Sequence, residues 1–183
     1  YDPGQALLMS LSYSQKGLAI IAQAKRSENM SFRSDRGLNN MSGTINHMTP
    51  FATQHTYMLA SLYPYGTHKT ANEWAFQGEI RYTWKRGTAM GGKYGTTLKL
   101  NASHIRGTGD TWFGMSKEAY YTDVNLELNK KLNKQWYIGA MAMYQTYNKQ
   151  AIEGHGDLIR AGIGVVEAKY ALNKKVQMRG EIQ

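Results

Sequence analysis

The sequence predicts an all-β protein, an antiparallel up-and-down transmembrane β-barrel of about ten strands. Three observations lead to this fold class. Apolar and polar residues alternate over long segments, the composition is rich in aromatic residues and glycine, and short and long connections follow one another in a regular order.

The composition favours sheet over helix. The chain has 183 residues, among them 13 Tyr, 4 Trp, 19 Gly and only 3 Pro. Aromatic residues pack well on a pleated sheet, and glycine closes tight turns. The longest aliphatic run, residues 18–22, is far shorter than the roughly 20 residues that a spanning helix needs. The mean hydropathy of -0.55 is still compatible with a barrel, whose strands alternate between lipid and a polar interior.

The segment Glu73–Trp84 shows the clearest alternation. Its apolar side begins with Trp74, passes through Ile80 and ends with Trp84, while charged and amide side chains occupy the other side. About ten residues at 3.3 Å each, tilted by roughly 40°, rise about 25 Å, which is the height of the apolar band of an outer-membrane barrel. We therefore expect this strand to cross a membrane, with Trp74 and Trp84 in the two aromatic girdles.

Further strands are predicted on both sides of this segment. They cover residues 5–14, 18–26, 41–48, 54–64, 88–104, 119–130, 135–147 and 157–172, and a last strand starts at residue 176. The strand at 41–48 is the weakest, and it is included because the connections lose their regular order without it. Tyr120 and Trp136 lie near strand ends and are added to the aromatic girdles.

The predicted connections alternate in length. Short turns fall at residues 15–17, 49–53, 85–87, 131–134 and 173–175, and longer loops fall at residues 27–40, 65–72, 105–117 and 148–156. Outer-membrane barrels have short turns on the periplasmic side and long loops on the outer side. The order of connections therefore favours a barrel over a sandwich.

The formal charge of +9 raises the question of an anionic partner. It fits a basic lumen or basic loops that attract anionic solutes or acidic polysaccharide head groups, and it also fits a solvated surface. Nucleic acid is not expected as a partner. The charged residues expected to face inward either line a watery lumen or pair across neighbouring strands. They are Glu79, Arg81, Lys93, Lys99, Asp123, Glu127 and Arg179.

The sequence offers no catalytic or metal-binding pattern. Its 5 His have no metal-ligand spacing and there is no Cys. A Gly-x-Ser-x-Gly elbow is missing, and the glycine-rich stretch at residues 91–96 does not match a phosphate-binding loop. We expect no enzyme activity, no metal and no cofactor, and we interpret Gly91 and Gly92 as a bulge or bend in a strand.

The two ends of the chain suggest a part of something longer. No leader precedes Tyr1, and residues 181–183 lie within a predicted strand. A barrel that stopped there would leave an open edge in lipid. We therefore expect residues 1–183 to form part of a single outer-membrane β-barrel domain, truncated at one or both ends.

Four stretches carry a resemblance to a known group of proteins: residues 29–36 (NMSFRSDR), 54–57 (QHTY), 63–65 (YPY) and 91–96 (GGKYGT). With them the chain resembles the porin-like outer-membrane β-barrel proteins of Bacteroidota, a largely uncharacterised family. The resemblance implies a location in the bacterial outer membrane, with the lipid bilayer, lipopolysaccharide and other outer-membrane proteins as partners. It assigns no functional residue.

One loop adds a charged cluster, Arg33, Asp35 and Arg36. Folded inward, it would constrict a pore; left outside, it would dock a partner or lipopolysaccharide, or simply keep the loop soluble.

Three functions remain open from the sequence. The first is a porin-like channel for small solutes, anionic ones included. The second is a non-conducting scaffold barrel in an outer-membrane assembly. The third is a soluble extracellular binding module, which predicts that Trp74 and Trp84 are buried against other protein.

Overall fold

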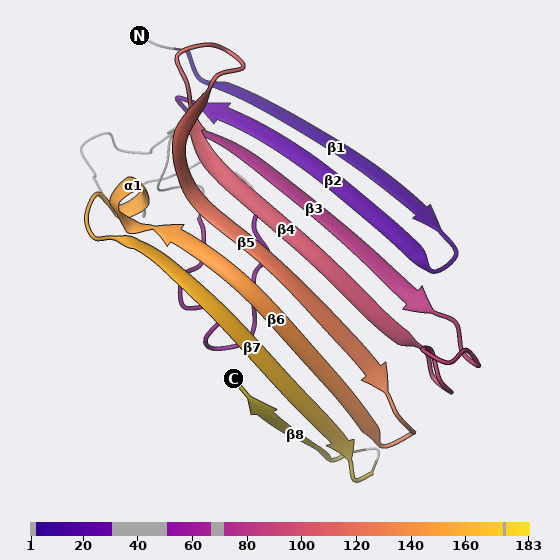
Figure 1. The fold of residues 1–183 in the computed structure, drawn as a ribbon. Coiled ribbons are helices and arrows are strands. Elements are labelled where there is room, and N and C mark those ends of the chain that lie inside the picture. The colour runs from indigo at the N-terminus through magenta and orange to yellow at the C-terminus, as the bar shows by residue number, and fades with distance from the viewer. Residues whose placement is uncertain (1–2, 31–50, 67–71, 174) are drawn as a thin grey trace.

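The computed structural model describes residues 3–30, 51–66, 72–173 and 175–183. Eight strands form one sheet in which each strand lies beside its neighbours in sequence, from β1 to β8 (Figure 1). The elements are β1 Gln5–Gln15, β2 Leu18–Glu28, β3 Glu73–Trp84, β4 Thr96–Thr108, β5 Met115–Lys131, β6 Trp136–Asn148, α1 Lys149–Glu153, β7 Leu158–Ala171 and β8 Gln177–Ile182.

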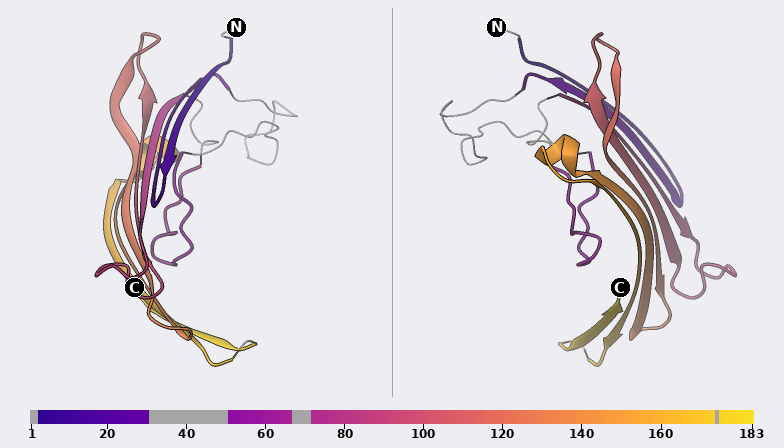
Figure 2. Two further views of the ribbon diagram at one scale, coloured as in Figure 1. Left: turned by 90° about the vertical axis from the view of Figure 1, so that its right-hand side faces the viewer. Right: turned by 60° about the vertical axis from the view of Figure 1, so that its left-hand side comes forward.

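The sheet is strongly curved, and it is open. All neighbouring strands are antiparallel, and β1 and β8 are its edges. Figure 2 shows the sheet as a trough, with residues 51–66 and α1 on its concave side. The predicted all-β, antiparallel, up-and-down sheet is confirmed. The expected count of about ten strands is wrong for the described residues, which form eight, and the sheet does not close into a barrel in this structure.

Residues 54–64 do not form the strand predicted for them. They run through bends and turns, and β2 pairs directly with β3, from Leu18 opposite Tyr82 to Ser27 opposite Glu73. No place is left between these two strands, so the segment packs on the concave face instead. The strand predicted at 41–48 lies outside the described residues.

The strand predicted at 88–104 starts later, at Thr96. Residues 85–95 form a loop, in which Gly92 and Gly95 have positive φ angles of 59° and 90°. A Cβ on Gly91 would lie 1.9 Å from the Lys85 carbonyl oxygen, so the loop closes only with glycine there. This connection is longer than residues 109–114 at the opposite end, and the predicted alternation of short and long connections is therefore not regular.

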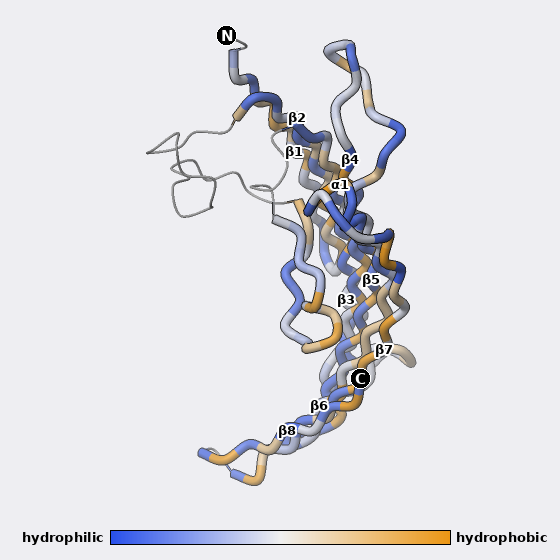
Figure 3. Tube along the Cα trace, turned by 90° about the vertical axis from the view of Figure 1, so that its left-hand side faces the viewer, coloured by the Kyte–Doolittle hydropathy of each residue, from blue (hydrophilic) through white to orange (hydrophobic). Residues whose placement is uncertain are grey.

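The two faces of the sheet differ in polarity. Register partners place Ile20, Ile80, Leu100 and Leu126 in one row on the convex side, which we call the outer face. The residues next to them along the strands, such as Glu79 and its register partner Asn101, point to the concave side, which we call the inner face. Figure 3 shows the resulting alternation of hydrophilic and hydrophobic residues along the strands.

The buried core lies on the inner face. One cluster joins the sheet to the segment 51–66 and to α1, and a second lies further along the same face. Their buried residues are Phe51, Ala52, Tyr65, Ala75, Ile105, Tyr121, Tyr147 and Ile152 in the first, and Ala60, Met141, Met143 and Val165 in the second. Within the described residues, no helix is both long and apolar enough to span a membrane.

Candidate functional site

The outer face is apolar across the whole sheet and exposed along its middle. Leu11 on β1 is 71% exposed, Ile80 on β3 44%, Leu126 on β5 43% and Val166 on β7 56%. Alanine and glycine fill other positions, such as Ala142 opposite Leu126. A monomeric soluble protein rarely exposes an apolar patch of this extent.

Aromatic side chains gather at the end of the outer face where β3 leads into residues 85–95, which we call the turn end. Tyr82 and Trp84 contact each other edge to face, with ring centroids 5.1 Å apart. Trp136 on β6 lies 4.8 Å from Tyr170, its register partner on β7. Two of the predicted girdle residues, Trp84 and Trp136, therefore lie at the same end of the outer face.

Trp74 lies at the other end, the loop end, and stacks on Phe76 at 5.8 Å. Its indole Nε1 donates a hydrogen bond to the Gly114 carbonyl oxygen at 3.0 Å, and Arg26 lies between it and Trp112. The β4–β5 connection thus covers Trp74, which is only 7% exposed.

Tyr120 does not belong to the outer face, and its assignment to a girdle is wrong. A β-bulge shifts the register between β4 and β5, so that Ile105 pairs with Tyr121 but Arg106 pairs with Ala119. The extra residue in a bulge breaks the alternation of side chains. Tyr120 accordingly packs against the inner-face core cluster.

The inner face carries a row of ion pairs. Lys99 on β4 lies 2.7 Å from Glu127, its register partner on β5. Glu167 on β7 accepts from Lys169 at 3.1 Å and from Arg179 on β8 at 2.8 Å. Opposite charges on this face therefore neutralise one another, both within β7 and across neighbouring strands.

The segment 51–66 is held on the inner face by polar contacts with three central strands. His55 Nε2 lies 2.6 Å from Asp123 Oδ2 on β5, and both side chains are buried. Thr53 Oγ1 donates to Asn101 Oδ1 on β4 at 2.7 Å, and Gln145 Nε2 on β6 donates to the carbonyl oxygen of residue 63 at 2.9 Å. We call residues 51–66 the covering segment.

A second buried group fixes the end of the covering segment. The Tyr65 hydroxyl donates to the Glu73 carboxylate, and Lys25 on β2 lies 2.6 Å from the same carboxylate. Lys25 is 3% exposed and Glu73 is fully buried. A buried carboxylate needs such partners, because an uncompensated charge in the interior is costly.

A polar cavity of about 300 Å³ remains between the covering segment and the sheet. His55, Tyr57, Lys99, Glu127 and Glu167 are among its lining residues. Burial, and then the charge of Glu167, raise the pKa of the Tyr57 hydroxyl.

The residues predicted to line a lumen fall into two groups. Most lie on the inner face: Glu79, Arg81, Lys99, Asp123, Glu127 and Arg179. Lys93 lies instead in the loop 85–95, since β4 starts at Thr96. Arg33, Asp35 and Arg36 are outside the described residues. In the part of the chain that the structure describes, no three His, Cys, Asp or Glu side chains are grouped to hold a metal ion.

Sequence reasoning missed several residues that fix the covering segment on the inner face: His55 within the segment, and Lys25, Glu73, Asn101 and Gln145 on the strands. For those on strands, alternation gives the face. It does not predict their contacts with the covering segment, because the sequence predicts residues 54–64 as a strand within the sheet.

The chain belongs to a family of unknown function, DUF6029, which matches residues 1–183. A comparison with curated proteins gave no match.

Proposed function

We propose that this chain forms the wall of an outer-membrane β-barrel and serves as a porin-like channel for small solutes. The single observation that carries the proposal is the inverted polarity of the sheet. Buried polar residues such as Asn101 and Asp123 lie on the inner face, and large apolar residues such as Leu11 and Ile80 are exposed on the outer face.

A membrane accounts for this polarity better than water does. Each Å² of apolar surface left in water costs roughly 25 cal/mol, and the outer face exposes large apolar side chains on every strand except β2, whose outer-face Ile20 is half-buried. In a bilayer the same side chains face lipid at no such cost, and Trp84, Trp136 and Tyr170 lie where the aromatic girdle of a barrel is found.

A membrane wall also requires its edges to be paired. The outermost strands, β1 and β8, each have one partner strand in this structure. Unpaired backbone groups in lipid cost several kcal/mol each, so only closed sheets span bilayers. We propose that further strands pair with both edges and close the wall. The resemblance to porin-like proteins of Bacteroidota suggests the outer membrane as the location.

The covering segment favours a second function, a non-conducting scaffold barrel. It occupies the inner face at mid-sheet, bound to β4, β5 and β6 through Asn101, Asp123 and Gln145. A barrel filled in this way passes solutes only if the segment moves or leaves room beside it. In a channel the covering segment moves or leaves room for solutes, whereas in a scaffold it keeps the interior filled.

Conductance of the full-length protein in planar lipid bilayers tests the two functions. A channel predicts steady current for the unmodified protein. A scaffold predicts insertion without current, both for the unmodified protein and for a variant in which residues 54–63 are replaced by a Gly-Ser linker of equal length. Current from the linker variant alone would identify the covering segment as the plug of a channel. Failure of the protein to insert into any bilayer would contradict both functions.

A further inference from the structure

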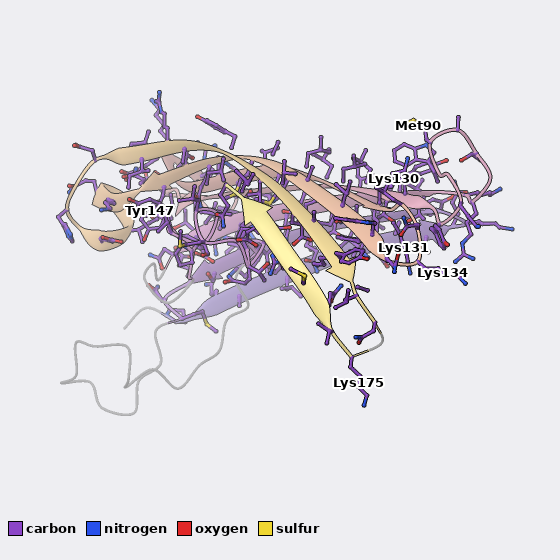
Figure 4. All side chains as sticks on the ribbon, turned by 90° about the horizontal axis from the view of Figure 1, so that it is seen from below. Met90, Lys130, Lys131, Lys134, Tyr147 and Lys175 are labelled. Atoms are coloured by element: carbon purple, nitrogen blue, oxygen red, sulfur yellow. The ribbon has the colours of Figure 1, made fainter. Side chains whose placement is uncertain are left out.

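The turn end of the sheet carries a one-sided charge. It comprises residues 16–17, 85–95, 132–135, 172–173 and 175–176 together with the adjoining strand ends. Every charged residue described there is a lysine or an arginine: Lys16, Lys85, Arg86, Lys93, Lys130, Lys131, Lys134 and Lys175. Figure 4 shows Lys130, Lys131 and Lys134 close to Met90 at this end, with Lys175 at the β7–β8 turn and Tyr147 at the opposite end.

The loop end has no such excess. Its connections and strand ends carry Asp110, Glu118, Glu153 and Asp157 beside basic residues such as Lys149. The positive charge of the described chain is therefore concentrated at one end of the strands and is not spread over the surface.

The cations at the turn end are not neutralised by neighbouring carboxylates. None of them forms an ion pair with another described residue. Lys130 Nζ donates to the Met90 carbonyl oxygen at 3.4 Å. Lys93 and Lys131 lie over the ring of Tyr94, 6.0 and 5.5 Å from its centroid. Like charges gathered without counter-charges favour an anionic partner.

The basic end continues the outer face beyond its aromatic side chains. Lys85 follows Trp84 directly, and Trp136 begins β6 two residues after Lys134. Lys130 lies on the same face of β5 as Leu126 and Leu128, opposite Thr96 on β4 and Ile138 on β6. In a membrane protein, tryptophan and tyrosine lie at the level of the lipid head groups, so these cations would lie beside the lipid phosphates.

We propose that the turn end binds the phosphate groups of anionic phospholipids in the leaflet that it faces. The proposal rests on the membrane location proposed above. It follows from the position of the cations next to the aromatic end of the apolar face, where the nearest abundant anions in a bilayer are lipid head groups.

The test uses the full-length protein folded into vesicles of equal parts phosphatidylcholine and phosphatidylglycerol. Flotation first measures insertion, and native mass spectrometry then counts the lipids that stay bound after extraction. The unmodified protein should retain phosphatidylglycerol in preference to phosphatidylcholine. Substituting Lys130→Gln and Lys134→Gln should lower that preference about fivefold or more, and the matched pair Lys117→Gln and Lys149→Gln near the loop end should leave it unchanged.

Other outcomes separate the possible failures. A protein that does not float with vesicles contradicts the proposed membrane function. A protein that inserts but retains both lipids equally overturns the lipid site and leaves the membrane function standing. The same holds if both double variants lose the preference for phosphatidylglycerol to the same extent. As a further measurement, inorganic phosphate is added to the extracted protein. If it displaces all the bound phosphatidylglycerol, the turn end binds free phosphate, and the lipid site is also overturned.

Discussion

The contact between His55 and Asp123 joins the covering segment to the sheet at a fully buried carboxylate. Asp123 also accepts from Asn125 Nδ2 at 3.0 Å and from the Tyr121 hydroxyl at 3.3 Å. The histidine is thus one of three partners, and it is the only one of them that belongs to the covering segment.

Substituting His55→Ala should lower the free energy of unfolding by about 1–3 kcal/mol, because the carboxylate loses one partner while it stays buried. Urea unfolding of the protein in vesicles, followed by tryptophan fluorescence, measures this. The control is His155→Ala, since the His155 side chain is 77% exposed and lies 3.8 Å from Glu153. Equal small effects of both substitutions would show that the segment is not held through His55.

The outer face offers a comparison of depth on a single strand. Ile80 lies in the middle of β3 and Trp84 at its turn end. An arginine at the bilayer midplane costs about 2–4 kcal/mol of folding free energy, and near the interface about 0–1 kcal/mol. Ile80→Arg should therefore destabilise the folded protein in vesicles far more than Trp84→Arg. Equal, small changes in the unfolding free energy would argue against lipid contact at Ile80.

At the scale of elements, the loop between β3 and β4 depends on one glycine. Gly91 lies against the Lys85 carbonyl oxygen, and its own N–H donates to Thr88 Oγ1 at 3.0 Å. The same threonine donates to the Lys85 carbonyl oxygen at 2.8 Å. The loop therefore folds on itself with no room for a side chain at residue 91.

Gly91→Ala should destabilise the protein by about 1–3 kcal/mol, because the loop must open to accept a Cβ atom. Gly162→Ala on β7 is the matched control, since a Cβ there has no atom within 4 Å. Thermal unfolding of the two variants gives the comparison. Equal unfolding temperatures for the two variants would contradict the close approach at residue 91.

Alternation predicted most strands well and failed where another force acts. The bounds of β3 agree with the predicted segment Glu73–Trp84, because β2 and β4 pair with its two edges along almost the whole segment. Residues 54–64 also alternate, but the inner face binds them through side chains and they join no strand. Sequence periodicity does not distinguish these two outcomes, which depend on contacts between distant segments.

The predicted site shows the same limit. Placing Lys99 and Glu127 on one face required only alternation, and the structure pairs them. The bulge that turns Tyr120 inward, and the loop that removes Lys93 from β4, are local departures from the strand period. No glycine or proline adjoins Tyr120 to mark its bulge, whereas Gly91 and Gly92 do mark the loop.

At the scale of the whole molecule, polarity and charge are arranged along two independent directions. Across the sheet, the inner face combines buried polar residues with the two apolar core clusters, whereas the outer face exposes mainly apolar side chains. Along the strands, the turn end is basic and the loop end carries both signs. Both gradients fit a wall that separates lipid from a polar interior and meets a head-group layer at its end.

The most direct test of a lipid-facing outer face is a spin-label scan of β3. The chain has no Cys, so single cysteines at residues 76–82 in the full-length protein give clean labelling sites. Oxygen concentrates in the bilayer and a nickel chelate stays in water. We predict that collisions with oxygen peak at residues 76, 78, 80 and 82, out of phase with the nickel chelate. Nickel access at residues 78 and 80 as high as at 77 and 79 would contradict the membrane wall.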